Sequence, residues 1–369
     1  MSTAKDTSYG NPTAIEKAGA AASLALHLPL VLGWTLLTSP FHHNNRHKSA
    51  KRVLGDKFFY HLTGRLNIKQ LQWLTGTTLD VYEAYVKANK LPRVVDELDE
   101  GARLLWIGER RTDRVILYFH GGAFLIPMQT TAAPFWKQAQ DELKSKGKDV
   151  GIAILQYSLV PTATFPTQLK QAVVAVQHLL SKGVQPQNIQ LTGDSAGGNL
   201  VLQLISHILH PVPDVPTLTL SSSFRGAYLM SPWVSLTSQA KSMFANDSSD
   251  ILSPGCLLYW GRAVVAGVPE SQIQYLEAIK APAGWFDGID KVVERLLITA
   301  GDAECLRDDI VVVTEKLVKL YKKDGTVRFM LQKYGVHNDP FFNFSTPGQK
   351  PGEVTPTILQ WFAAGFKGN

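Results

Sequence analysis

The feature that most constrains the fold of this 369-residue chain is the segment 191–199, Leu-Thr-Gly-Asp-Ser-Ala-Gly-Gly-Asn. An apolar run precedes it and an apolar helical pattern follows it, so the segment joins a strand to a helix through a sharp turn at Ser195. Gly193, Ala196 and Gly197 give this serine small neighbours, which a strained backbone turn requires. The Gly-x-Ser-x-Gly pattern also arises in ordinary loops, so its meaning depends on the rest of the chain.

A second glycine turn, His120-Gly121-Gly122, ends another apolar strand. Because glycines leave main-chain N–H groups uncovered, we expect the N–H groups of Gly121, Gly122 and Ala196 to face an oxyanion. Such donors stabilise the charge on a carbonyl oxygen attacked by a serine, typically by a few kcal/mol. His120 and Asp194 belong to the two turns and are expected to support them. Taken alone, the turn would be only the end of a strand, but it occurs together with the serine turn.

Candidate acids and a candidate base follow the serine along the chain. The apolar run 296–299 leads to Asp302 and Glu304, and the apolar run 327–331 leads to His337. The order serine, acid, histidine is that of the α/β-hydrolases and differs from both classical serine protease families. Histidine suits this position because its pKa near neutrality lets it take the serine proton and return it to the leaving group. Asp302, which directly follows the strand, and Glu304 are rival acids.

These motifs resemble the hormone-sensitive-lipase-like branch of the α/β-hydrolases, in particular its fungal esterase and steryl acetyl hydrolase-like members. The resemblance covers about residues 95–365 and includes Tyr157-Ser-Leu-Val-Pro161, followed by Phe-Pro. Ser158 stands where that family usually has arginine, a departure that bears on local packing more than on chemistry.

The resemblance also bears on the choice of acid. In the family the acid lies three residues before an arginine, and Glu304-Cys-Leu-Arg307 matches that register. The resemblance therefore implies Ser195, Glu304 and His337 as catalytic residues, with Asp302 as the rival acid.

The wider pattern predicts an α/β fold with a mostly parallel central sheet flanked by helices and covered by a helical cap. Apolar strand-like runs alternate with helical stretches, and lie at 115–119, 150–155, 189–192, 227–230, 296–299 and 327–331. We assign residues 93–369 to an α/β-hydrolase catalytic domain with a cap insertion at about 233–288. Residues 1–92 form an N-terminal segment whose helices, from about 51, complete the cap.

The N-terminal segment contains a nearly continuous apolar stretch at 18–37, with basic residues after it. A membrane anchor and a cap helix both fit this stretch, although His27, Pro29 and Gly33 interrupt it. The start lacks the pattern of a secretory signal, so we expect an intracellular protein, cytoplasmic or membrane-associated.

Composition excludes several other classes of protein. The net charge of +6 is spread along the chain without the basic and aromatic clusters of nucleic-acid binding. Two cysteines are too few for a disulfide scaffold and favour a reducing compartment. We expect no metal, because the histidines at 42, 43 and 47 lack partners at ligand spacing, and no cofactor, because no phosphate-binding loop is present.

The sequence thus predicts a serine hydrolase acting on small-molecule carboxylic esters. The resemblance implies that the ester has a short acyl group, such as acetyl, on a bulky apolar alcohol. One alternative is a biosynthetic enzyme of fungal secondary metabolism that performs acyl transfer, lactone opening or condensation with the same residues. Another is a ligand-binding module like the plant gibberellin receptors, which lack the catalytic histidine; the presence of His337 argues against it. The oligomeric state stays open.

Overall fold

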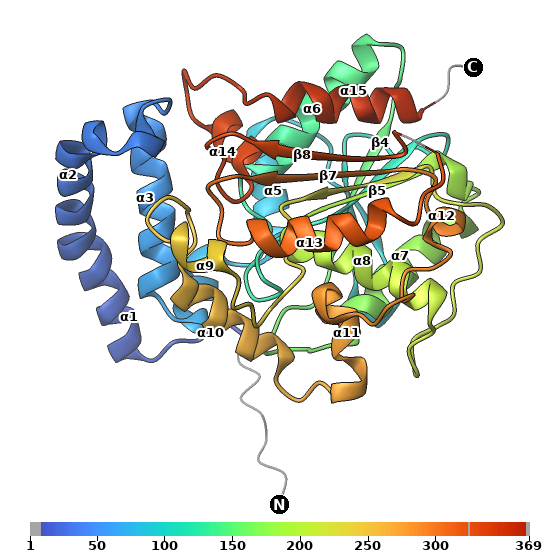
Figure 1. Ribbon diagram of the computed structural model, residues 1–369, viewed down its shortest axis with the longest axis horizontal. Helices are drawn as coiled ribbons and strands as arrows, with labels where there is room; N and C mark the ends of the chain where they lie inside the picture. The colour runs from blue at the N-terminus through green and yellow to red at the C-terminus, as the bar shows by residue number, and fades with distance from the viewer. Residues whose placement is uncertain (1–8, 324, 367–369) are drawn as a thin grey trace, which may run out of the picture.

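The computed structural model describes residues 9–323 and 325–366. Its centre is an eight-stranded sheet of order β1-β2-β4-β3-β5-β6-β7-β8, with helices on both faces (Figure 1). The strands are β1 (Val94–Glu97), β2 (Arg103–Ile107), β3 (Val115–Phe119), β4 (Gly151–Gln156), β5 (Ile189–Asp194), β6 (Gly226–Met230), β7 (Leu296–Gly301) and β8 (Val327–Gln332).

The predicted mostly parallel sheet is confirmed. From β4 to β8 every neighbouring pair is parallel, whereas β1, β2 and β4 pair antiparallel. The six predicted strands are all present, and β1 and β2 are additions. Sequence patterns missed them because both are short and begin or end on charged residues.

The two faces of the sheet bury different sets of side chains, as the alternation of a strand requires. In β3, Val115, Leu117 and Phe119 belong to one core cluster, and Ile116 and Tyr118 to the other. Side chains of three helices join the first cluster: α7 (Thr167–Ser181), α8 (Ala196–Leu209) and α13 (Arg307–Val318). Those of three others join the second: α5 (Thr78–Ala88), α6 (Ala132–Ser145) and α15 (Val354–Gly365).

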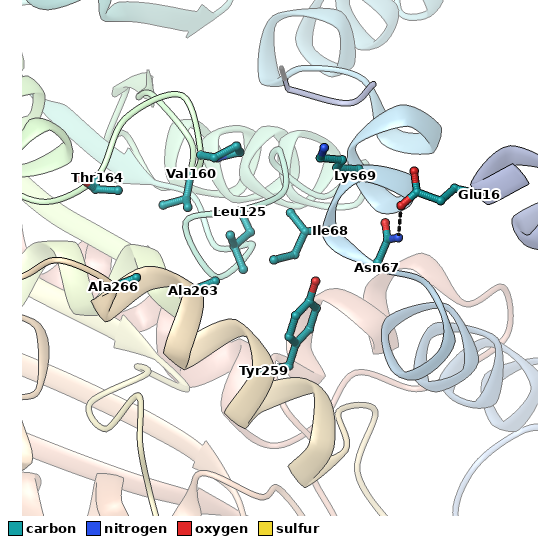
Figure 2. Close-up of a pocket in the computed structure, with 11 residues that line it drawn as sticks. Glu16, Asn67, Ile68, Lys69, Leu125, Val160, Thr164, Tyr259, Ala263 and Ala266 are labelled. Carbon is teal, nitrogen blue, oxygen red and sulfur yellow. Dashed lines mark hydrogen bonds between the residues drawn. The ribbon is translucent and has the colours of Figure 1, made fainter. Parts of the chain in front are cut away.

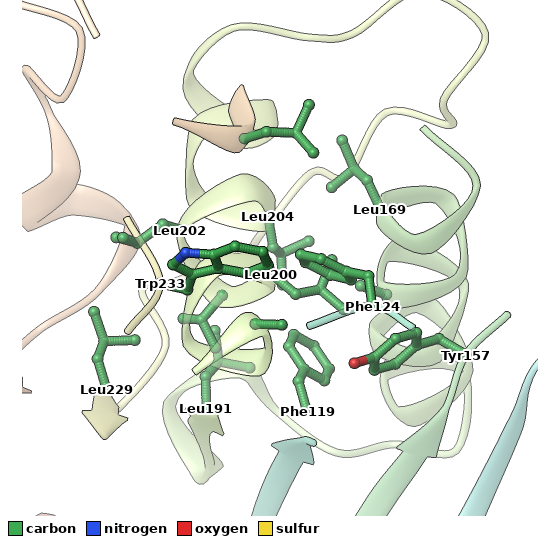
Figure 3. Packing of buried hydrophobic residues seen from close by; sticks show 14 of the residues in the cluster. Phe119, Phe124, Tyr157, Leu169, Leu191, Leu200, Leu202, Leu204, Leu229 and Trp233 are labelled. Carbon is green, nitrogen blue, oxygen red and sulfur yellow. The ribbon is translucent and has the colours of Figure 1, made fainter. Parts of the chain in front are cut away.

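Helix α8 is fixed against the sheet by its apolar side chains. Figure 3 shows Leu200 and Leu204 of α8 in the same packed cluster as Leu191 of β5 and Phe119 of β3. All four are fully buried, and burial of each such side chain is worth about 1.5–3 kcal/mol. The start of α8, where the serine turn lies, is therefore held rigidly at the edge of the sheet where the carboxyl ends of the parallel strands meet.

Helices from two distant parts of the chain lie beyond this edge. The N-terminal part supplies α3 (Ala50–Arg65) and α4 (Ile68–Thr75), and the segment after β6 supplies α9 (Lys241–Ala245) and α10 (Pro254–Val265). The same segment also forms α11 (Ile273–Leu276) and α12 (Ile289–Val292), which contact α8 instead. Another short helix, α14 (Asp339–Ser345), follows β8. Residues 68–88 form two helices, α4 and α5, because Gly76 has φ +67° and Thr77 caps α5. Helix α5 then packs against the sheet.

The apolar N-terminal stretch forms one long helix. Helix α1 (Ala14–Ala22) continues through a π-helical turn (Ser23–His27) into α2 (Leu28–Thr38), which lies beside α3 (Figure 1). The helical span Ala14–Phe41 is long and apolar enough to cross a membrane, and its most apolar 18-residue window has a mean hydropathy of 1.7. Residues 1–8 of the predicted N-terminal segment lie outside the described residues.

Candidate active site

The serine turn has the strained geometry that its sequence predicts. Ser195 has φ +51° and ψ −117°, and its N–H donates to the Met230 carbonyl at 2.9 Å. The Ser195 carbonyl accepts from the Trp233 N–H at 3.0 Å. A Cβ atom on Gly197 would lie 1.8 Å from the Phe119 carbonyl oxygen, so only glycine fits there. The turn is therefore held by neighbouring strands and leaves Ser195 at the N-terminus of α8.

Ser195 and His337 line one small cavity. Its walls also include Gly122, Ala123 and aromatic and aliphatic side chains of the cap: Phe59, Trp233, Leu252, Leu257 and Trp260. The space amounts to about 20 Å³, little more than one water molecule needs. The serine and the histidine therefore face the same small cavity.

Glu304 faces the histidine from a buried position. Its Oε2 accepts hydrogen bonds from the Ser231 hydroxyl at 2.6 Å and the Gly301 N–H at 2.8 Å. Its Oε1 lies 3.7 Å from Nδ1 of His337, and neither of these two atoms has another hydrogen-bond partner among the described residues. The carboxylate is therefore oriented by one oxygen and directed at the imidazole by the other.

The rival acid, Asp302, makes its hydrogen bonds with residues other than His337. Its main-chain carbonyl accepts from the Arg307 guanidinium at 2.9 Å and from the Asn246 side chain at 3.2 Å. Asp302 is partly exposed, and within the described ranges its carboxylate makes no ion pair with His337. The structure brings Glu304, and not Asp302, to the histidine.

The electrostatic surroundings of His337 favour its protonated form. Burial is the largest influence and lowers its pKa, but Glu304, Asp250 and Asp194 outweigh burial and raise the pKa above its ordinary value. A histidine in this setting gains a proton readily, as a base that accepts one from a serine must.

The predicted oxyanion donors are partly corrected. The N–H of Gly121 is donated to Oδ1 of Asp194 at 2.8 Å, so the prediction that Gly121 faces an oxyanion is wrong. Gly122 and Ala123 instead line the cavity, with φ of +109° and +57°, and their N–H groups have no acceptor among residues 9–323 and 325–366. The N–H of Ala196 opens α8, where no intrahelical partner exists. Sequence reasoning missed Ala123, whose signal is its place after the two glycines.

Asp194 holds the two turns together. Its carboxylate accepts from the Tyr118 hydroxyl at 2.5 Å, the Gly121 N–H at 2.8 Å and the Asn338 side chain at 2.8 Å. Burial raises its pKa, while the hydrogen bonds from Tyr118 and Gly121 lower it in part. Asp194 therefore supports the serine turn and the glycine turn, as the sequence predicts, and also links them to the loop that carries His337.

His120 is a structural residue of the same region. Its Nε2 lies 3.0 Å from the Thr78 hydroxyl, and its ring stacks on Tyr157 with centroids 4.3 Å apart. Burial lowers the pKa of His120 to about 4, so it is neutral near pH 7. It anchors the end of β3 to α5 and cannot compete with His337 as the base.

The two cysteines do not supply a second nucleophile. Cys256 and Cys305 are free and buried, and burial raises the pKa of Cys256 to about 11. Both thiols stay protonated near neutral pH because burial also raises the pKa of Cys305. The described part of the chain has no group of three histidine, cysteine or carboxylate side chains arranged to hold a metal.

A larger cavity lies on the other side of α10. Figure 2 shows it surrounded by Ile68, Leu125, Val160, Tyr259 and Ala263, with a volume of about 400 Å³. Its rim is polar, since Glu16 accepts a hydrogen bond from Asn67 there. Consecutive residues of α10 separate the two cavities: Tyr259 lines the larger one, and Trp260 lines the one at Ser195.

Comparisons with known proteins agree with this geometry. Residues 106–350 match the sequence profile of the steryl acetyl hydrolase family. The mug81 protein of Schizosaccharomyces pombe is 26% identical over 356 residues, covering 89% of this chain and 91% of its own. An acetyl-hydrolase of Streptomyces hygroscopicus is 28% identical over 210 residues, covering 55% of this chain and 62% of its own.

A solved structure supports the same fold. An esterase from the bacterial hormone-sensitive lipase family superposes with a TM-score of 0.64 at 19% identity, over 87% of this chain and 99% of that one. The α/β-hydrolase fold predicted from the sequence is therefore confirmed. Together with the family profile, this shows that the chain is an ester hydrolase that belongs to the steryl acetyl hydrolase family, within the α/β-hydrolases related to hormone-sensitive lipase.

Proposed function

We propose that this protein is a serine esterase whose catalytic triad is Ser195, His337 and Glu304. The observation that carries the proposal is the buried Glu304 carboxylate opposite Nδ1 of His337, in a histidine that shares one cavity with Ser195. We leave Asp302 out of the proposed triad, because among the described residues its carboxylate forms no ion pair with His337.

In the proposed mechanism the Ser195 hydroxyl attacks the acyl carbon while His337 takes its proton. Glu304 holds the imidazole in the correct tautomer and stabilises the imidazolium that forms. His337 then protonates the leaving alcohol, and a water activated by the same histidine releases the acyl group from the serine. The small cavity leaves room for little more than this water beside the acyl-enzyme.

The negative charge on the attacked carbonyl needs donors near Ser195. We assign this role to the N–H groups of Gly122, Ala123 and Ala196, because Gly121 already donates to Asp194. These donors are fixed in place by the turns before any substrate arrives, and removal of one such donor typically costs about 10²–10³ in rate.

The substrate is proposed to be an ester with a small acyl group on a bulky apolar alcohol. The cavity beside Ser195, at about 20 Å³, favours an acyl group as small as acetyl. The cavity of about 400 Å³ is mostly apolar and has the size of a small-molecule site. We propose that it receives the alcohol when α10 shifts, because in this conformation that helix separates it from Ser195. The description of the matching family and the name of the Streptomyces relative both specify acetyl hydrolysis and support this choice.

We also propose that the helix Ala14–Phe41 associates with a lipid bilayer. At about 1.5 Å per residue, its 28 residues exceed the roughly 30 Å of a hydrocarbon core. Only 11% of its most apolar window is buried in the protein, so most of its apolar surface lacks a protein partner. Arg46 and Lys51, both exposed, follow the helix and suit anionic lipid headgroups.

The intact mass of the protein after incubation with a fluorophosphonate tests the proposed function. We expect one adduct per chain and none in Ser195→Ala, because only an activated serine beside oxyanion donors reacts in this way. A folded wild-type protein that forms no adduct would refute the triad. Product analysis with and without an added acceptor alcohol then separates hydrolysis from acyl transfer.

A further inference from the structure

Asp250 is a buried carboxylate beside the triad. It lies in the loop between α9 and α10 and is only 5% exposed. Its Oδ1 accepts a hydrogen bond from the main-chain N–H of His337 at 2.9 Å, and its Oδ2 accepts from the N–H of Cys305 at 2.8 Å. One side chain thus binds the main chain at the proposed base and at the residue directly after the proposed acid.

We propose that Asp250 is the positioning residue that fixes Glu304 and His337 opposite one another for proton transfer. The proposal rests on the triad assigned above. Asp250 does not contact the reacting atoms; it acts through the two loops that carry the acid and the base.

The two loops need such a connection because they leave the sheet on separate strands. Main-chain bonds join them near the sheet, the outermost of these running from the Ala303 N–H to the Gly335 carbonyl at 2.9 Å. Glu304 and His337 lie beyond that point, and their facing atoms are 3.7 Å apart. Asp250 continues the connection past both residues, so it limits how far the acid and the base can separate.

Asp250 also links the triad to the cap. Its neighbour Ser249 accepts a hydrogen bond from the Asn44 side chain at 2.6 Å, in the turn that follows the N-terminal helix. Ile251 and Leu252, the next two residues of the cap, are buried. The geometry of the acid and the base therefore depends on a residue that the cap, and not the sheet, supplies.

The charge of Asp250 acts on His337 as well. The charged groups that face His337 are Glu304, Asp250 and Asp194, and all three raise its pKa against the effect of burial. Burial raises the pKa of Asp250 itself to about 6. Asp250 borders a polar cavity that it shares with titratable groups of the N-terminal part: His42, Lys48, Asp56, Lys57 and Tyr60. Removal of the Asp250 charge should therefore lower the pKa of His337.

The test compares Asp250→Asn with the matched control Asp247→Asn, which lies in the same loop and bonds only the Tyr60 hydroxyl among the described residues. Steady-state hydrolysis of p-nitrophenyl acetate is measured from pH 5 to 9. For Asp250→Asn we expect kcat to fall about 10²-fold, as small misplacements of catalytic groups do, with KM changed less than about threefold. We expect the acidic limb of the pH profile to move to lower pH. The control should match the wild type in all three respects.

Two results would overturn the role of Asp250: a kcat within about threefold of wild type, or a lower kcat with the acidic limb unmoved, which indicates a structural effect only. If Asp250→Asn does not fold, Asp250→Glu and Asp250→Gln form the decisive pair, since they have the same length and only Glu keeps the charge and both acceptor oxygens. The acidic limb should stay in place in the first and move in the second, and limbs that coincide would overturn the proposal. A wild-type protein without turnover or fluorophosphonate labelling would instead refute the triad itself.

Discussion

The apolar side chains near Ser195 are buried, whereas those of the N-terminal helix Ala14–Phe41 are mostly exposed. Around Ser195, apolar side chains are buried and most polar groups have partners within the protein. Along the N-terminal helix, Leu30 is 73% exposed, Trp34 70% and Phe41 84%, while within 14–41 only Ala20 and Leu28 are buried.

The two regions therefore differ in the contacts that stabilise them. The catalytic edge is specified by internal contacts, so its geometry belongs to the folded chain alone. The exposed apolar side chains of the helix have few partners within the protein, and the proposed bilayer would cover them. Substitutions should therefore affect catalysis strongly at the sheet edge and weakly at the helix, while membrane association should show the reverse order.

The largest expected effect is at the buried acid. Glu304→Gln should lower kcat by on the order of 10³- to 10⁴-fold, because the imidazole loses the carboxylate that sets its tautomer. Asp302→Asn is the matched comparison at the same loop and should stay within about twofold of wild type. Steady-state kinetics on a soluble acetate ester measures both, and the opposite ranking of the two variants would show that the acid is misassigned.

The next effect is the pH dependence of the wild-type enzyme. His337 must be neutral to accept the serine proton, and its pKa is raised above its ordinary value, mainly by Glu304 against the opposing effect of burial. The acidic limb of kcat/KM should therefore lie above pH 6.5, and activity at pH 5.5 should be more than about tenfold below the plateau. A pH profile of kcat/KM that stays flat down to pH 5.5 would contradict this environment for the base.

An intermediate effect is expected at the larger cavity, where the cap meets the N-terminal helices. Ala263→Trp should fill it and raise KM for acetates of bulky apolar alcohols by about tenfold, while ethyl acetate is hydrolysed within about twofold of wild type. Arg262→Trp is the control, since it places the same side chain at an exposed position of α10. Equal losses for large and small esters would mean that the cavity does not hold the alcohol.

The smallest effect on catalysis is expected at the N-terminal helix. Leu30→Glu combined with Trp34→Glu should leave turnover of a soluble ester within about twofold, because both side chains are exposed. Co-sedimentation with vesicles that contain anionic lipid should nevertheless be lost. The control Asn89→Glu with Gln185→Glu adds the same charge at exposed sites elsewhere and should still sediment. Unchanged sedimentation of the Leu30 and Trp34 variant would refute the bilayer as the partner.

Sequence alone determined the parts of the site that depend on local geometry. The small residues around Ser195 predict the turn, because the strained backbone there excludes larger side chains. The chain order of Ser195, the acids and His337, together with the apolar strand runs, predicts an α/β-hydrolase sheet with the site at its edge.

The tertiary structure decided what depends on residues far apart in the chain. The family resemblance favoured Glu304 over Asp302, and the structure adds that the Glu304 carboxylate faces His337, which depends on how the fold orients the loop. The structure alone shows that Gly121 is committed to Asp194, 73 residues away, and that Ala123 faces the cavity in its place. Asp250 carries no motif, since its role consists of hydrogen bonds to two loops that the sheet brings together. A strained turn requires small residues next to it, so the sequence shows it directly. Hydrogen-bond partners far apart in the chain are set only when the chain has folded.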